Sequence, residues 1–204
     1  MRAVITGATG GIGGATAEAL GRAGYEVIIT GIDLEAGKKV IDKLESQGIK
    51  VHFYACDATN EEQVNETFAK IGEEFGSLDL LVNNVGGLGG RQRVSEMETG
   101  FMRKVMALNF DSVFFNTRAA LPLLKKGKDA SIVNFSTIAV TSGAGIGASI
   151  YAASKGASRA TLVLWQRIWP SSASAPTWFL PAPSTLPSTL RLTAPWWRAG
   201  RTAS

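Results

Sequence analysis

The sequence contains little that could bind a metal ion or form a disulfide. It has one cysteine, Cys56, and one histidine, His52, among 204 residues. A single cysteine excludes an internal disulfide, and these two residues cannot supply the ligand set that zinc needs. We therefore expect no metal and a structural role for both residues. The scarcity of cysteine suits a reducing compartment and indicates the cytoplasm.

Long apolar runs are absent as well. No stretch approaches the ~18–20 consecutive apolar residues of a membrane-spanning helix, although hydrophobic residues make up 45% of the chain. The first residues, MRAVITGATGG, lead directly into a strand-like run and lack the layout of a signal peptide. We expect a globular protein without a membrane partner.

Most of the chain has no excess of charge of either sign. The formal net charge is +4, yet residues 1–164 hold 17 basic and 17 acidic side chains. The whole excess comes from arginines in the remaining segment, namely Arg167, Arg191, Arg198 and Arg201. Scattered charge of this kind does not form the clustered basic surface that nucleic acid requires. We therefore expect no nucleic-acid partner.

Residues 1–164 alternate between strand-like and helix-like patterns. Short runs rich in β-branched residues alternate with amphipathic segments. The expected strands are 2–6, 26–30, 50–57, 78–84 and 130–137. The expected helices are 11–24, 34–47, 60–75, a long one from about 99 to 126, and one from about 150 to 164. This alternation predicts a doubly wound, Rossmann-like α/β fold with a parallel sheet and helices on both faces.

A glycine-rich turn joins the first expected strand to the first helix. The stretch VITGATGGIGG puts Gly7, Gly11 and Gly13 at the start of that helix, where N–H groups are unpaired and the helix dipole is positive. Glycine lets a pyrophosphate approach the backbone closely. An ordinary glycine-rich turn is the alternative, but the strand–turn–helix context favours a dinucleotide site.

Tyr151 and Lys155 lie four residues apart in IYAASKGA, so they share one face of a helix. A free phenol ionises only near pH ~10, and a nearby ammonium group favours the phenolate. Such a pair can move a proton while a nicotinamide moves a hydride. An isolated pair of this kind is more often a surface tyrosine and an extended lysine. The glycine loop upstream and the strand ending in Ser136 and Thr137 favour the catalytic interpretation.

Together these motifs resemble the short-chain dehydrogenase/reductase family over about residues 3–160. The spacing T-G-x-x-x-G-x-G resembles the family's glycine motif, and CDATN, LVNNVGG, ALNFDSVFF and Y-x-x-x-K resemble its later motifs. The resemblance implies an NAD(P)-dependent enzyme that interconverts a small-molecule alcohol and a ketone by hydride transfer. The alternatives are a catalytically inactive nucleotide-binding remnant and a methyltransferase-like Rossmann domain. The spacing of Tyr151 and Lys155 argues against the methyltransferase.

The resemblance also implies roles for individual residues. Tyr151 would be the acid/base, Lys155 would favour its phenolate, and Asn109 would help to order a proton-relay water. Thr137 stands where the family has its catalytic serine and keeps the hydroxyl that polarises a carbonyl, with Ser136 as the alternative. The implied cofactor-binding residues are Thr6, Gly7, Gly11, Ile12, Gly13, Asp33, Asp57, Asn83, Asn84, Gly86, Tyr151 and Lys155.

The resemblance leaves NAD and NADP both open and favours NAD slightly. NAD-preferring members tend to carry an acidic residue at the place of Gly31, and NADP-preferring members an arginine at the place of Ile32; this chain has neither. Asp33 lies nearby and would repel a 2′-phosphate. The family further implies a homotetramer or homodimer through helices 99–126 and 150–164, if the C-terminal segment is intact.

Residues 165–204 break the pattern. They hold all five tryptophans and six of the seven prolines, and proline is excluded from long helices and from central strands. We therefore expect a Rossmann-like domain over 1–164, followed by an aberrant Pro/Trp-rich tail, with the C-terminal strands of the fold missing or disordered.

A change of reading frame accounts for this tail. Read one base out of frame, with permitted codon choices, residues 164–188 can encode LAKDLALQRIRANVVSPGAIDTPFH. That string resembles the family segment that is missing here. We infer a single-base frameshift between Lys155 and Leu164, either natural or introduced by sequencing. The alternative is a genuine tail that binds partners or is disordered.

Overall fold

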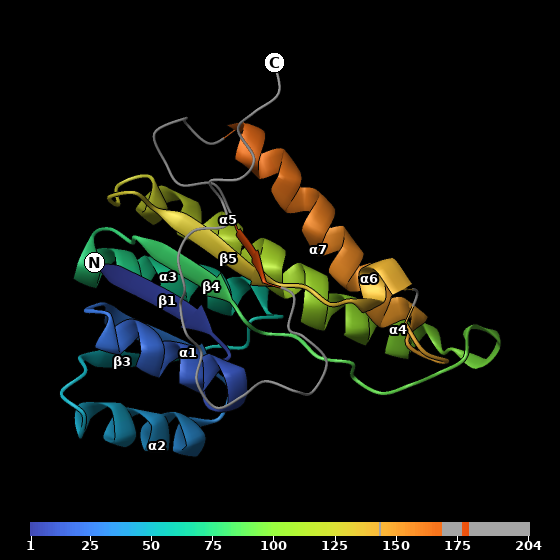
Figure 1. Cartoon of the computed structure of the whole chain (residues 1–204), viewed down its shortest axis with the longest axis horizontal. Helices are drawn as coiled ribbons and strands as arrows, with labels where there is room; N and C mark the ends of the chain where they lie inside the picture. Colours follow the sequence, from blue (N-terminus) through green and yellow to red (C-terminus); the bar gives the residue numbers. More distant parts are fainter. Residues whose placement is uncertain (143, 169–176, 180–204) are drawn as a thin grey trace.

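The computed structural model describes residues 1–142, 144–168 and 177–179, which form a parallel sheet with helices against both faces (Figure 1). The strand order is β3-β2-β1-β4-β5-β6. The strands are β1 (Arg2–Thr6), β2 (Glu26–Gly31), β3 (Val51–Ala55), β4 (Leu80–Asn83), β5 (Ser131–Phe135) and β6 (Thr177–Phe179). The helices are α1 (Gly11–Arg22), α2 (Leu34–Glu45), α3 (Glu61–Phe75), η1 (Val94–Glu96), α4 (Thr99–Met106), η2 (Ala107–Asp111), α5 (Ser112–Leu124), α6 (Ala139–Ser142) and α7 (Ser149–Ile168).

The central strands are buried on both faces, and their side chains alternate between two hydrophobic cores. Val4 and Ile28 pack with residues of α3 and α5 on one face, whereas Ile5 and Ile29 pack with residues of α1 and α2 on the other. Successive residues of a strand point to opposite faces, so a continuous apolar run suits a strand covered on both sides. The predicted doubly wound parallel fold is confirmed.

The order of the strands reverses between β1 and β4. β1 pairs in parallel with β2 on one side and with β4 on the other. In sheets of this kind, ligands bind in the crevice outside the carboxyl ends of the strands at the reversal. The strand arrows in Figure 1 point to one common edge, from which the loops after Thr6, Asn83 and Phe135 emerge.

We expected one helix from about Thr99 to Lys126, and the structure divides it into three segments. The π-helix η2 separates α4 from α5. Asn109 lies inside η2, and its Nδ2 donates to the carbonyl of Val105, four residues earlier, at 3.0 Å. That carbonyl is the one to which the backbone N–H of residue 109 would donate in a regular α-helix, and here the side-chain amide of Asn109 bonds to it. Single π-turns within helices are frequent at functional sites.

The C-terminal part of the described chain differs from the expectation. α7 continues past Leu164 to Ile168, and β6 pairs in parallel with β5. We expected the strands after residue 164 to be missing or disordered. For Thr177–Phe179 the structure shows a strand instead. Threonine, tryptophan and phenylalanine all favour strands, and the segment contains no proline. The rest of the predicted tail, 169–176 and 180–204, lies outside the described residues.

Candidate active site

The glycine-rich loop leaves the start of α1 without a side-chain cap. Gly7 and Gly11 have φ values of +63° and +54°, in the left-handed region that favours glycine. The N-cap residue is Gly10, and the first turn holds no acidic residue. By contrast, backbone N–H groups at the starts of α2 and α3 donate to the side chains of Asp33 (2.9 Å) and Asn60 (3.1 Å). The positive end of α1 is therefore open to an anionic group.

Asn84 fastens this loop to the end of β4. Its Nδ2 donates to the carbonyls of Thr6 and Gly7, both at 3.0 Å, and its backbone N–H donates to Oγ1 of Thr6 at 3.1 Å. A Cβ at Gly13 would lie 2.6 Å from that Nδ2, so glycine is what lets α1 begin so close to β4. Ile12, next to it, is 54% exposed. Thr6 and Asn84 therefore set the shape of the loop, and Ile12 projects from it.

The structure places Asn83 in the interior. Its Nδ2 donates to Oγ1 of Thr117 at 2.9 Å and to Oδ1 of Asn134 at 2.8 Å, and all three residues are buried. These bonds tie β4 to α5 and β5. We predicted a cofactor contact for Asn83; its side chain faces the core and supports the end of β4, directly before Asn84.

The two predicted acidic residues lie at the same edge of the sheet. Asp33 is exposed and caps α2. Asp57 is half-buried, and its Oδ1 accepts from the backbone N–H and the hydroxyl of Thr59 at 2.9 and 2.8 Å. A Cβ at Gly31 would lie 2.5 Å from Cγ2 of Thr9, so the end of β2 touches the glycine loop. Asp33 thus lies just past the strand whose end touches this loop, and Asp57 lies just past the next strand, β3.

Tyr151 and Lys155 both lie on α7. Lys155 is only 4% exposed, and its Nζ donates to the carbonyl of Phe135 at the end of β5 at 3.0 Å. Burial lowers the pKa of this ammonium group to about 8, because the charged form loses hydration. Tyr151, one turn earlier, is half-buried and lines a cavity. The α7 helix therefore brings a buried amine and an accessible phenol to the carboxyl end of β5.

Asn109 and Lys155 converge on the backbone of Gly86. A Cβ at Gly86 would lie 2.7 Å from Nζ of Lys155 and 2.8 Å from Oδ1 of Asn109. Asn109 also exchanges two bonds of 2.9 Å with Gly87: its Oδ1 accepts from the backbone N–H, and its Nδ2 donates to the carbonyl. The Oγ of Ser158 donates to the carbonyl of Asn109 at 2.8 Å. The π-helix, α7 and the loop after β4 therefore meet at this point.

The two candidate hydroxyls after β5 differ in their surroundings. Thr137 and Tyr151 line one cavity of about 350 Å³, whose walls include Leu88 and Ile138. Ser136 is not among its lining residues; it is buried, and its Oγ has no hydrogen-bond partner in the part of the chain that the structure describes. Of the two residues, Thr137 is the one that lines the cavity with Tyr151, and its Oγ1 accepts from the backbone N–H of Ala139 at 3.3 Å.

Sequence reasoning did not identify Ser158 or the carbonyl of Phe135. The spacing from Lys155 to Ser158 was a usable signal, since residues three apart share a helix face. The carbonyl of Phe135 gave no signal, because its orientation depends on how the end of β5 packs against α7.

His52 and Cys56 make contacts away from this cavity. Nε2 of His52 lies 3.0 Å from Oε1 of Glu26. Burial raises the pKa of the Cys56 thiol, which is the opposite of what a reactive cysteine needs. Within 1–142, 144–168 and 177–179, no group of His, Cys, Asp and Glu side chains could hold a metal ion. In those ranges, no helix is long and apolar enough to cross a membrane.

Comparison with known proteins yields close relatives by sequence. The short chain dehydrogenase family profile matches residues 1–166. A 3beta-hydroxysteroid dehydrogenase of Mediterraneibacter gnavus is 38% identical over 136 residues, 67% of this chain and 49% of that protein. An NADP-dependent (R)-specific alcohol dehydrogenase of Lentilactobacillus kefiri is 36% identical over 137 residues, 67% of this chain and 54% of that protein. The chain thus spans about half the length of these relatives.

Solved structures agree with the sequence relatives. The NADH-dependent reductase A1-R′, described as responsible for alginate metabolism, superposes with a TM-score of 0.80 at 31% identity, covering 88% of this chain and 74% of that one. An alcohol dehydrogenase from the archaeon Thermococcus sibiricus superposes with a TM-score of 0.78 at 29% identity and the same coverage. Family profile, relatives and fold all confirm the resemblance that the motifs indicated, and the chain belongs to the short-chain dehydrogenase family.

Proposed function

We propose that this chain is an NAD(P)-dependent oxidoreductase that interconverts a small-molecule alcohol and a ketone. One observation carries the proposal: Thr137 and Tyr151 line one cavity, while Lys155 and Asn109 converge on Gly86 at the same end of the sheet. A hydroxyl donor, a phenol and an amine are the groups that proton transfer to a carbonyl oxygen requires.

The residues present fit a nicotinamide dinucleotide. The uncapped start of α1, with Gly11, Ile12 and Gly13, would hold the pyrophosphate. Asp57 would hold the adenine, and Lys155 the nicotinamide ribose. When bound, the cofactor supplies or accepts the hydride.

The proton is handled by the chain itself. For reduction, the Tyr151 hydroxyl gives its proton to the substrate oxygen while the Thr137 hydroxyl donates a hydrogen bond to that oxygen. For oxidation, the Tyr151 phenolate takes the proton of the alcohol. Lys155, one turn further along α7, is the buried amine of the site.

Asn109 acts as a positioning residue in this proposal. Both N–H donors of its side chain are engaged, one with the carbonyl of Gly87 and one with the carbonyl of Val105. An amide so engaged fixes the loop at Gly86 and Gly87, and its Oδ1, which accepts from Gly87, has a second lone pair for the relay water that the family resemblance implies.

The preference between NAD and NADP remains a slight one for NAD. Gly31 and Ile32 offer neither an acid for a ribose hydroxyl nor an arginine for a 2′-phosphate. Asp33 is exposed just past the end of β2, where its charge would oppose a 2′-phosphate. Relatives include both an NADP-dependent alcohol dehydrogenase and an NADH-dependent reductase.

A titration of the purified chain with NADH and NADPH, followed by cofactor fluorescence, tests the proposal together with turnover on a panel of alcohols and ketones. Binding with turnover supports the oxidoreductase. Binding without turnover favours the second candidate, a catalytically inactive nucleotide-binding remnant. The sequence after residue 164, which departs from the family pattern, is the observation that favours testing it. Binding of neither cofactor would contradict both.

We also propose a cellular location and an oligomeric state for the protein. The one cysteine, which is free and buried, suits a reducing compartment such as the cytoplasm, and reporter fusions would test that location. A homodimer or homotetramer through α4, α5 and α7 follows from the family resemblance, and light scattering of the purified chain would test it.

A further inference from the structure

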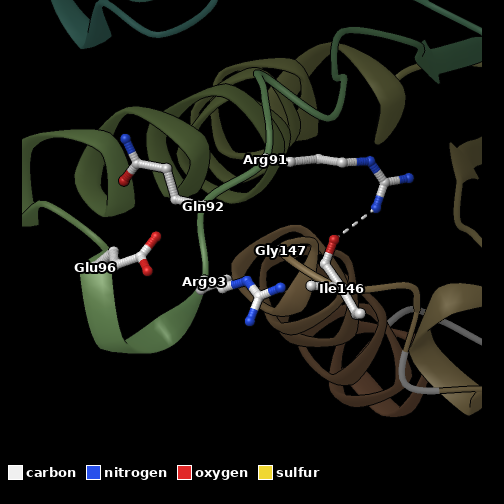
Figure 2. A pocket seen from close by; sticks show the side chains of 6 residues that line it. All are labelled: Arg91, Gln92, Arg93, Glu96, Ile146 and Gly147. Carbon is white, nitrogen blue, oxygen red and sulfur yellow. Dashed lines mark hydrogen bonds between the residues drawn. The ribbon is translucent and has the colours of Figure 1, made fainter.

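Arg91 lines two neighbouring cavities. The reaction cavity, of about 350 Å³, is the one that also contains Thr137 and Tyr151. The arginine cavity, of about 380 Å³, is lined by Arg91, Gln92, Arg93, Glu96, Ile146 and Gly147 (Figure 2). A molecule bound with its reacting carbon near Tyr151 therefore has Arg91 on the wall of the same cavity.

The position of Arg91 is fixed by two anchored segments. Its Nη1 donates to the carbonyl of Ile146 at 2.9 Å, as Figure 2 shows, and the backbone N–H of Gln92 donates to the carbonyl of Gly147 at 3.1 Å. Gly147 has a φ of +79°, and a Cβ there would lie 3.1 Å from Cβ of Arg91. The two segments therefore lie in direct contact, and the guanidinium is held where it can meet a ligand without a large rearrangement.

The arginine cavity carries uncompensated positive charge. Arg2, Arg22 and Arg118 each form an ion pair, whereas no ion pair involves Arg91 or Arg93 within the described residues. Glu96 also lines the cavity, and Figure 2 shows its carboxylate well apart from Arg91. Two guanidinium groups against one carboxylate leave one net positive charge. A guanidinium has five N–H donors, and the bond to Ile146 uses one of those of Arg91.

We propose that Arg91 binds a carboxylate of the substrate, with Arg93 adding positive charge, so that this chain acts on small hydroxy acids and oxo acids. The inference rests on the proposed oxidoreductase function and specifies its substrate class. Guanidinium groups bind carboxylates through two parallel hydrogen bonds. One net positive charge matches a monocarboxylate better than a phosphate, and a reaction cavity at the small end of the usual ~300–1,000 Å³ range suits a small molecule.

Kinetics with matched substrate pairs tests the inference. The full chain is assayed with 2-oxobutanoate and 4-oxopentanoate, each against its methyl ester, and with glycerone phosphate against glycerone. We expect kcat/KM to be higher for the acid than for its ester, and the acid-to-ester ratio to fall about 10–100-fold in Arg91→Gln. Arg103→Gln, an exposed arginine on α4 that lines neither cavity, is the control and should leave the ratio unchanged. Equal kcat/KM for acid and ester, or a preference confined to the phosphate, would overturn the proposal.

Ligand binding gives a readout that does not depend on turnover. Saturation-transfer NMR of 4-oxopentanoate and its methyl ester, with and without NADH, should show the acid binding to the wild-type chain and not to Arg91→Gln. If cofactor binding fails while the acid still binds through Arg91, the oxidoreductase proposal is contradicted and the carboxylate site stands. If the acid binds no better than the ester, the carboxylate site is overturned even where the ester is reduced.

Discussion

At the scale of single residues, the candidate site combines two kinds of polar group. Thr137 and Tyr151 line a cavity of about 350 Å³, whereas Lys155 and Asn109 are buried and bonded to the backbone carbonyls of Phe135 and Gly87. The first pair is placed to touch a substrate. The second pair ties η2 and α7 to the backbone at Gly87 and Phe135, so substitutions in the two pairs should have different effects.

The first prediction separates the two hydroxyls after β5. Thr137→Val keeps the shape of the side chain but removes the hydroxyl, and should lower kcat/KM about 100–1,000-fold, as the loss of one donor to a reacting oxygen does. Thr137→Ser, which keeps the hydroxyl, should stay within about tenfold of the wild type. Ser136→Ala should change little, because Oγ of Ser136 has no partner among the described residues. A large loss in Ser136→Ala with a mild effect of Thr137→Val would reverse the assignment.

The second prediction concerns the charge on Lys155, whose pKa burial lowers to about 8. Below that pH the amine is charged in both the folded and the unfolded chain, so the folded state carries the whole cost of burying the charge, about 3 kcal/mol. Between pH ~8 and ~10.4 the folded chain releases its proton first, and the free energy of unfolding rises with pH. Above both values the cost is gone.

Lys155→Met removes this titration. Urea unfolding at pH ~7 and ~9.5 should therefore show the wild type gaining about 2 kcal/mol relative to the variant between the two values. Lys155→Leu should give the same pH dependence, since neither replacement titrates. Both variants should also lose turnover while keeping the fold. A difference between wild type and variant that does not change with pH would show that burial does not perturb this amine.

At the scale of elements, the glycine loop and the start of α1 form the part of the site most constrained by packing. Asn84 joins the loop to β4 through three hydrogen bonds to Thr6 and Gly7. The helix can start against Asn84 only because Gly13 lacks a side chain. The N-cap residue of α1 is Gly10, which has no side chain to cap the helix. The N-terminus of α1 is therefore open to a phosphate.

The third prediction compares two adjacent glycines of α1. A Cβ at Gly13 would lie 2.8 Å from Cα of Ala8 and 2.8 Å from the carbonyl of Gly7, and backbone atoms cannot move aside cheaply. Gly13→Ala should therefore cost about 1–3 kcal/mol and weaken binding of NADH. A Cβ at Gly14 would meet nothing closer than 3.7 Å, so Gly14→Ala should stabilise the helix by about 0.5–1 kcal/mol. Denaturant unfolding of both variants checks this contrast, and equal effects would contradict it.

The sequence was sufficient to predict the order of the first five strands and of the main helices between them, and the common helix of Tyr151 and Lys155. The central strands β1, β2 and β4 carry continuous apolar runs, as a sheet covered on both faces requires, and the Tyr151–Lys155 spacing marks one face of α7. Two features could not be predicted. The sequence carries no signal for the π-helix, within which the side chain of Asn109 bonds to the carbonyl of Val105. The arginine cavity depends on contact between Gln92 and Gly147, which lie far apart in the sequence.

At the scale of the whole molecule, the question is how far the fold continues beyond α7. The family profile ends at residue 166, close to the point where the alternation of strands and helices stops in the sequence. The described part of the sheet ends in β6, a strand of three residues paired with β5 on one side. A short edge strand adds few backbone hydrogen bonds to the sheet. The proposed frameshift would account for the loss of the strand–helix alternation in the sequence after residue 164.

The fourth prediction tests that frameshift in the protein. In the second reading frame, residues 177–179 become Val-Val-Ser, so the segment that forms β6 would gain two apolar β-branched residues, which favour strands. A chain in which residues 164–188 are replaced by LAKDLALQRIRANVVSPGAIDTPFH should be more stable by about 3 kcal/mol or more, with a thermal midpoint about 6–12 °C higher. It should also bind NADH more tightly. The control carries the same 25 residues in scrambled order. If the scrambled chain is as stable as the ordered one, the second frame does not encode the family's next strand. The tail is then a genuine segment translated in its own reading frame.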